Sequence, residues 1–259
     1  MTSASSERDD LRPLIEQAVG HTARPAEDRV RDASSKPAEV LAFLGAAPGM
    51  TVLDLHAATG YFTELLAYVV GADGQVIAHN HPGALTVLPP DTFERRFGGG
   101  RLRNVEQLFA RHAEINLPSG RLDAALMSLI YHDIYWSAPD VDWGPVDPQA
   151  LLAGLFDALK PGGVVVVLDH HAESGADPHR SAAATHRIDA AVVRRDFERA
   201  GFALDCESDL LRNVEDDYSA SVFDPAVLGR TDRFLMRFRR PEWLREKPDV
   251  QGDRFDANA

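Results

Sequence analysis

Short apolar runs alternate with amphipathic segments along most of the chain, from residue 51 to about residue 239. The apolar runs predict strands at 51–55, 75–79, within 104–111, 122–129 and 164–168, with two more near 202–211 and 232–239. The intervening segments predict helices at about 60–70, 83–97, 147–159 and 189–200. The run 164–168 is apolar throughout, which is typical of a parallel strand buried on both faces. This alternation predicts an α/β fold with a doubly wound, mostly parallel seven-stranded sheet and right-handed crossovers.

The chain divides into three parts by its pattern. Residues 1–46 predict an N-terminal helical extension whose first ten or so residues are frayed, residues 47–240 carry the α/β alternation, and residues 241–259 form a polar C-terminal tail. Ligands of doubly wound sheets bind outside the carboxyl ends of the strands, where the strand order reverses. The residues that follow each predicted strand are therefore the candidates for function.

The first predicted strand runs into the segment Asp54-Leu-His-Ala-Ala-Thr-Gly60, and a helix opens at Tyr61. This segment resembles the strand-to-helix turn of class I S-adenosylmethionine (SAM) methyltransferases, which has an acidic residue followed by three glycines at alternate positions. Glycines suit such a turn because its backbone must approach the cofactor closely. Here His56 and Ala58 occupy the first two glycine positions and Gly60 the third.

Other segments extend the resemblance over about residues 24–240. Leu159-Lys-Pro-Gly-Gly163 and Ala200-Gly-Phe202 stand where this Rossmann-like family enters its fifth and sixth strands. Three more segments resemble a bacterial subgroup of predicted class I methyltransferases whose substrates are mostly unassigned. They are Arg31-Asp32 with Lys36-Pro-Ala-Glu-Val-Leu41, Tyr131-His-Asp-Ile-Tyr-Trp136, and Asp169-His170, and the stretch from Glu207-Ser-Asp to Arg230-Thr-Asp232 is a fourth.

The resemblance implies SAM as cofactor. The residues that it places at the cofactor are Asp54, His56, Ala57, Ala58, Gly60, Tyr61, Asn80, His112, Ala113 and Ser128. Asn80 stands where the family has an acid for the ribose hydroxyls, and an amide is a weaker acceptor than a carboxylate. His112 stands where an Asp contacts the adenine. The side chain of His56 must point away from the cofactor for SAM to fit, so a scaffold that has lost SAM is the alternative.

Four polar residues follow later strands and should meet at the same edge of the sheet. They are His132, Asp133, His170 and His186. We interpret them as catalytic, with histidines orienting a small-molecule acceptor and removing its proton during methyl transfer to oxygen or nitrogen. This interpretation assigns no metal ligand. Two alternatives stay open: a divalent metal enzyme that uses the three histidines and a carboxylate, or histidines that only satisfy loop backbone groups.

The composition of the chain limits the classes of partner that we expect. The chain has 27 Lys and Arg against 40 Asp and Glu, a net charge of −13, which disfavours binding to nucleic acid. No apolar run approaches the roughly 20 residues that span a bilayer, and the N-terminus lacks a signal-peptide pattern, so we expect no membrane partner. Cys206 is the single cysteine, which fits a cytoplasmic protein. The segment 218–230 could cover the site or form a homodimer contact.

Overall fold

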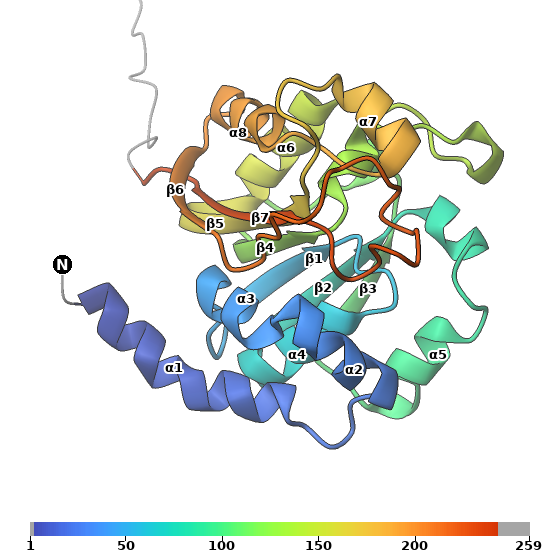
Figure 1. The fold of residues 1–259 in the computed structure, drawn as a ribbon. Coiled ribbons are helices and arrows are strands. Elements are labelled where there is room, and N and C mark those ends of the chain that lie inside the picture. The colour runs from blue at the N-terminus through green and yellow to red at the C-terminus, as the bar shows by residue number, and fades with distance from the viewer. Residues whose placement is uncertain (1–2, 243–259) are drawn as a thin grey trace, which may run out of the picture.

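The computed structural model describes residues 3–242 and shows a seven-stranded sheet between two layers of helices (Figure 1). The strands are β1 (Thr51–Leu55), β2 (Gln75–Asn80), β3 (Val105–Phe109), β4 (Leu122–Ser128), β5 (Leu159–His170), β6 (Ala203–Ser208) and β7 (Arg233–Arg239). The helices are α1 (Ser3–Val19), α2 (Ala26–Ser35), α3 (Pro37–Leu44), α4 (Tyr61–Val70), α5 (Thr92–Phe97), α6 (Pro148–Ala158), α7 (Pro178–Thr185) and α8 (Ala190–Arg199). Short 3₁₀ turns include η3 (His112–Glu114) and η4 (Tyr131–Ile134).

The strand order is β3-β2-β1-β4-β5-β7-β6. The first five strands are parallel, and β7 runs antiparallel to both β5 and β6. The order reverses between β1 and β4, so the loops after these two strands leave the sheet in opposite directions and open a crevice there. The predicted fold class is confirmed: the sheet is doubly wound, mostly parallel and seven-stranded.

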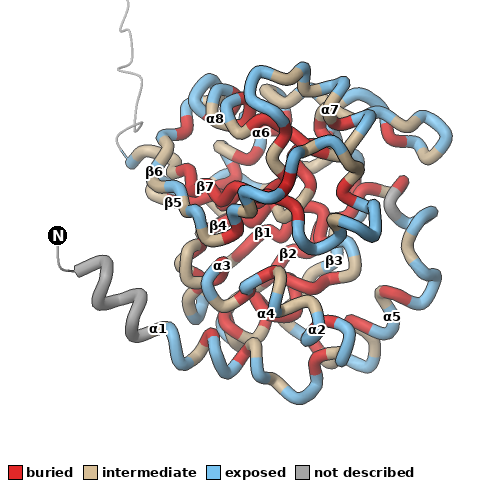
Figure 2. The backbone as a smooth tube through the Cα atoms, viewed as in Figure 1, coloured by how far each residue is buried: buried red, intermediate tan, exposed pale blue. Residues whose placement is uncertain are grey.

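Two helical layers bury the two faces of the sheet. Helices α1, α3 and α4 pack on one face, and α6 and α8 pack on the other (Figure 1). Buried residues follow the central strands in Figure 2, since β1, β4 and β5 are apolar on both faces. Aromatic stacking joins α8 to the sheet, with the rings of Phe197 and Phe238 4.1 Å apart. The two layers hold the carboxyl edge of the sheet in a fixed geometry.

Two predictions about the elements are wrong. The first residues were expected to be frayed, yet α1 begins at Ser3 and continues to Val19, because its apolar residues, such as Ile15, pack against the core. Strand β5 begins at Leu159 rather than at Val164, because Leu159 pairs with Leu122 ahead of an irregularity in the β4 ladder. The predicted polar tail lies outside the described residues from position 243 onward.

Candidate active site

The turn between β1 and α4 has the backbone of a glycine-rich loop although it contains one glycine. His56, Ala58 and Gly60 have φ angles of 58°, 50° and 81°. This left-handed region costs a residue with a side chain about 1–2 kcal/mol, whereas glycine enters it freely. A Cβ at Gly60 would also lie 2.9 Å from the Cζ atom of Phe97, so the end of that ring would have to shift. The turn thus keeps its shape at all three alternate positions.

Asn80 clamps this turn from the end of β2. Its Oδ1 accepts a hydrogen bond of 2.8 Å from the amide of Ala58, and its Nδ2 donates to the Ala58 carbonyl at 3.4 Å. The side chain that we expected at the ribose therefore also supports the loop. Ser128, at the end of β4, has a buried Oγ that meets no partner within residues 3–242. A buried hydroxyl without a partner is costly and suits a site that receives a ligand.

The side chains of two other predicted cofactor residues are hydrogen-bonded to side chains of the protein itself. The carboxylate of Asp54 accepts a 2.6 Å hydrogen bond from Thr63 on α4, and burial raises the pKa of Asp54 to about 6. The hydroxyl of Tyr61 donates to Asp32 at 2.6 Å, which fixes the start of α4 against α2. Both residues position the turn, and their contact with a cofactor stays a prediction.

Four histidines at the ends of β1, β2 and β3 pack together with one tryptophan. They are His56, His79, His81 and His112, and with Trp143 we call them the imidazole cluster. The Nε2 atoms of His56 and His112 are 2.7 Å apart, so one ring donates a hydrogen bond to the other. The indole of Trp143 lies against three of the rings, with centroids 5.0 Å from His56, 4.7 Å from His81 and 5.3 Å from His112. The side chain of His56 is therefore held within the cluster.

The imidazole cluster is held neutral. Burial, with the neighbouring imidazoles, lowers the pKa of His112 to about 3 and that of His56 well below its usual value. Burial lowers the pKa of His79 to about 4, although its Nε2 donates to the carbonyl of Ala110. The second nitrogen of His79, Nδ1, is buried and meets no partner in the described part of the chain. These rings therefore act at neutral pH as uncharged packing and hydrogen-bonding groups.

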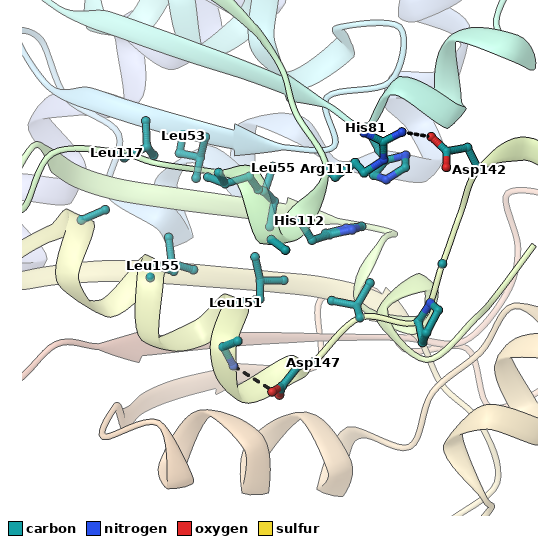
Figure 3. Close-up of a pocket in the computed structure, with 18 residues that line it drawn as sticks. Leu53, Leu55, His81, Arg111, His112, Leu117, Asp142, Asp147, Leu151 and Leu155 are labelled. Carbon is teal, nitrogen blue, oxygen red and sulfur yellow. Dashed lines mark hydrogen bonds and ion pairs between the residues drawn. The ribbon is translucent and has the colours of Figure 1, made fainter. Parts of the chain in front are cut away.

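A cavity of about 360 Å³ opens beside the imidazole cluster (Figure 3). Its floor is apolar and includes Leu53, Leu55, Leu151 and Leu155, and its rim is polar and includes His81, Arg111, His112 and Asp142. Arg111 and Asp142 form an ion pair of 2.5 Å that joins the base of η3 to the loop before α6. The volume lies at the lower end of the range for small-molecule sites. The predicted residues His112 and Ala113 line this cavity.

A second polar group lies beyond β4. His132 and Asp133 come from η4, Asp169 and His170 from β5, and His186 from the turn after α7. Asp169 accepts hydrogen bonds from the ring Nδ1 of His132 at 2.8 Å, from the His132 amide at 2.9 Å and from the His170 amide at 2.7 Å. Asp133 Oδ1 lies 3.3 Å from His132 Nε2 and 3.2 Å from His186 Nδ1. All four residues predicted to be catalytic are therefore neighbours.

The charges of these histidines differ. His132 is buried, which opposes ionisation, but the carboxylates Asp169 and Asp133 raise its pKa to about 9. His170 is also buried, and burial together with the cationic groups around it lowers its pKa well below the usual value. The Nδ1 of His170 is bonded to the hydroxyl of Thr231 at 2.7 Å. At neutral pH His132 is thus a hydrogen-bond donor, whereas His170 is neutral and a weak base.

The aromatic residues of η4 and of the segment that follows it have separate roles. Tyr131 is fully buried and donates to Asp196 on α8 at 3.1 Å, so it belongs to the core. Trp136 lies 5.2 Å from the ring of His186, and Phe223, from the predicted covering segment, lies 4.9 Å from the same ring. The segment 218–230 therefore reaches the polar group.

The sequence pattern missed the imidazole cluster as a unit. His79 and His81 were not singled out, and His56 and His112 were interpreted only as substitutes for family residues. A signal was present, since all four histidines stand within three residues of the carboxyl ends of neighbouring strands. Applying the strand-end rule to β1, β2 and β3 together would have brought them together.

Comparisons with known proteins agree with the fold. No family model matches the chain. The ubiquinone/menaquinone biosynthesis C-methyltransferase UbiE of Vibrio campbellii is 28% identical over 125 residues, 48% of this chain and 43% of that protein. A protein-L-isoaspartate O-methyltransferase of Triticum aestivum is 29% identical over 123 residues, 46% of each chain. The matched segment thus spans less than half the length of these curated relatives.

Solved structures extend the comparison to most of the chain. A SAM dependent methyltransferase from Aquifex aeolicus superposes with a TM-score of 0.54 and 20% identity, over 78% of this chain and 88% of that one. The chain has the class I methyltransferase fold. The sequence relatives named above are methyltransferases, and the structural neighbours include SAM-dependent methyltransferases, as the sequence resemblance implied, together with the [4+2]-cyclase SpnF, which superposes with a TM-score of 0.54 and 17% identity over 90% of this chain and 93% of that one. Within residues 3–242 no helix combines the length and apolar character needed to cross a membrane.

Proposed function

We propose that the protein is a SAM-dependent methyltransferase that acts on oxygen or nitrogen of a small-molecule acceptor. The observation that carries the proposal is the turn after β1, which has left-handed residues at all three glycine positions of the family pattern. Holding His56 and Ala58 in this conformation costs free energy, and a tight turn at the head of α4 is what a cofactor approaching the backbone requires. The relatives support the methyltransferase activity, and they include both a C-methyltransferase and an O-methyltransferase, so the choice of oxygen or nitrogen is part of the proposal.

The residues at this turn fit the cofactor in three respects. No side chain among the described residues caps the first turn of α4, which leaves a helix N-terminus to receive the methionine carboxylate. The hydroxyl of Ser128 is a buried group that lacks a partner in the described structure. The cavity lined by His112 and Ala113 is large enough for the adenine. SAM, when bound, supplies a methyl group on a positively charged sulfur and leaves as a neutral thioether.

The polar group beyond β4 provides what the acceptor needs. Asp169 fixes the orientation of His132 by accepting from its Nδ1, and the Nε2 of His132 faces Asp133 at 3.3 Å, so this pair forms a fixed polar surface that orients the acceptor. His170 is neutral, and its Nδ1 is bonded to the hydroxyl of Thr231, so it contributes an uncharged hydrogen-bonding ring beside the acceptor. We assign the removal of the acceptor's proton to this group of histidines, and positioning the acceptor among them is the main contribution of such a site.

Isothermal titration of the full chain with SAM and with S-adenosylhomocysteine tests the proposal. We expect binding of both, and an approximately fivefold weaker affinity in Ser128→Ala, because one hydrogen bond contributes about 1 kcal/mol. Ser219→Ala, at an exposed turn, is the matched control and should bind as the wild type does. Failure to bind either compound at millimolar concentration would refute the proposal.

A scaffold without cofactor is the second candidate, and one observation favours it. Trp143 and three rings of the imidazole cluster pack together over the ends of β1, β2 and β3, beside the predicted cofactor residues. If the indole of Trp143 occupies the space that SAM needs, the loop before α6 must move for SAM to enter. Trp143→Ala separates the candidates, since it should enhance SAM binding if the indole obstructs the crevice and leave no binding if the protein is a scaffold.

A further inference from the structure

One group of three side chains has the composition and spacing of a metal site. His132, Asp133 and His186 each offer one ligand atom, and these atoms all lie within 4.8 Å of one another. Among the described residues it is the one such group. The distances from Asp133 Oδ1 to His132 Nε2 and to His186 Nδ1 are 3.3 Å and 3.2 Å. Two ligands at about 2.0 Å from one tetrahedral ion are separated by about 3.3 Å, which matches both distances from Asp133, and a closer approach of the two imidazoles completes the site around one ion.

The surroundings of His132 orient it for a metal. Asp169 is fully buried and accepts from the Nδ1 of His132, and two backbone amides, those of His132 and His170, hold the same carboxylate in place. A hydrogen bond at Nδ1 directs the lone pair of Nε2 toward Asp133. An imidazole held in this way between a carboxylate and an ion is the usual support of protein metal ligands.

The group also leaves room for a further ligand. The side chains of Asp133 and His186 keep exposed fractions of 17% and 19%, whereas that of His132 keeps 4%. The site is therefore anchored on the buried side and reachable from the crevice. Three protein ligands with an open position are typical of catalytic rather than structural metal sites.

His170 is not part of this group. Its ring centroid lies 6.0 Å from that of His132, and its Nδ1 is bonded to Thr231. The metal alternative that the sequence suggested used His132, His170, His186 and a carboxylate. The structure favours a different set, in which Asp133 is the carboxylate and His170 stands beside the site.

We propose that His132, Asp133 and His186 bind one divalent transition metal ion, of the Zn²⁺, Co²⁺, Ni²⁺ or Fe²⁺ class. Two imidazoles and one carboxylate are the ligands that these ions share. The ion replaces the proton on Nε2 of His132 and keeps at least one position for an outside ligand. If the protein is the methyltransferase proposed above, that ligand is the acceptor, whose hydroxyl or amine the ion makes more acidic.

Titration of the chelator-treated full chain with CoCl₂ tests this inference, followed by calorimetry and by the visible d–d absorption of bound Co²⁺. We expect one ion per chain, with the intense bands of a four- or five-coordinate site that contains imidazole. Asp133→Asn and His186→Gln should each weaken binding at least about tenfold, and Asp169→Asn about 10–100-fold through its effect on His132. The control is His179→Gln, at an exposed histidine on the neighbouring helix α7, which should bind as the wild type does.

Three results would overturn the inference: no Co²⁺ bands, a stoichiometry of zero, or equal affinity in His186→Gln and wild type. Far-UV circular dichroism shows whether each variant is folded, and His186 lies in a turn where substitution is tolerated better than at buried His132. SAM binding is measured on the same metal-free sample. Metal binding without SAM binding supports the metal site and refutes the methyltransferase, whereas SAM binding without metal does the reverse.

Discussion

Acid should destabilise the protein through the imidazole cluster. The folded-state pKa values of His79 and His112 are about 4 and about 3, and that of His56 is also depressed well below 6.5. In the unfolded chain all three ionise near pH 6.5. The folded protein therefore binds fewer protons than the unfolded protein below pH 6.5. The stability that the neutral rings provide is complete above that pH and is lost as the pH falls.

The magnitude follows from these values. Between pH 7 and pH 5 a group with a pKa of 6.5 in the unfolded chain and of about 4 or lower in the folded protein loses about 2 kcal/mol of stability. His79 and His112 together account for about 4 kcal/mol, and His56, whose pKa is also lowered, adds to the loss. Domains are stable by about 5–15 kcal/mol, so the loss is a large fraction of the whole.

Urea unfolding at pH 7, 6 and 5, followed by far-UV circular dichroism, measures this loss. The variant His79→Gln keeps a donor for the Ala110 carbonyl but has no titrating ring, so its loss between pH 7 and pH 5 should be smaller than that of the wild type by about 2 kcal/mol. His179→Gln, at an exposed histidine, should show the wild-type loss. An equal loss in His79→Gln and wild type would refute the assignment of acid sensitivity to the cluster.

Three further predictions concern other parts of the structure. Asp216→Asn leaves the fully buried guanidinium of Arg187 without its charged partner and should lower the free energy of unfolding by about 3–5 kcal/mol in urea titrations. Gly60→Ala forces a Cβ into a left-handed turn and against Phe97, so calorimetry should show a loss of about 1–2 kcal/mol, and no loss would contradict the packing described. Asp142→Ser removes only the exposed ion pair at the cavity rim and should change stability by less than about 1 kcal/mol, with a larger effect showing that the rim supports the fold.

Much of the fold could be predicted because the sheet is buried on both faces. Runs such as Val164–Leu168 are apolar at every position, and the turns around them contain Gly and Pro, so the strands can be predicted from the sequence. The start of β5 was missed because it depends on a partner: Leu159 joins the ladder by pairing with Leu122, and no local pattern encodes that pairing. The start of α1 was missed for a similar reason, since packing against α3 and α4 stabilises a sequence that is polar in its first turns.

The candidate site was predictable where topology alone gathers residues. His132, Asp133, His170 and His186 follow strands or turns at one edge, and the rule about carboxyl ends places them together without any knowledge of side-chain packing. The rule could not tell which histidine pairs with which carboxylate. That choice depends on rotamers, and only the structure shows that Asp133 lies between His132 and His186 while His170 turns to Thr231.

The left-handed residues at positions 56 and 58 are bonded to residues outside the turn, which limits how the turn can be redesigned. His56 is tied to His112 by a hydrogen bond, and Ala58 is tied to Asn80 by two. Restoring glycine at both positions removes backbone strain, but it leaves His112 without its partner. The bonds of Ala58 to Asn80 use backbone atoms and survive in glycine, whereas substitutions at positions in direct contact, such as 56 and 112, are not additive. The turn should therefore be exchanged as one block, with the residues after β2 and β3 chosen together, rather than one position at a time.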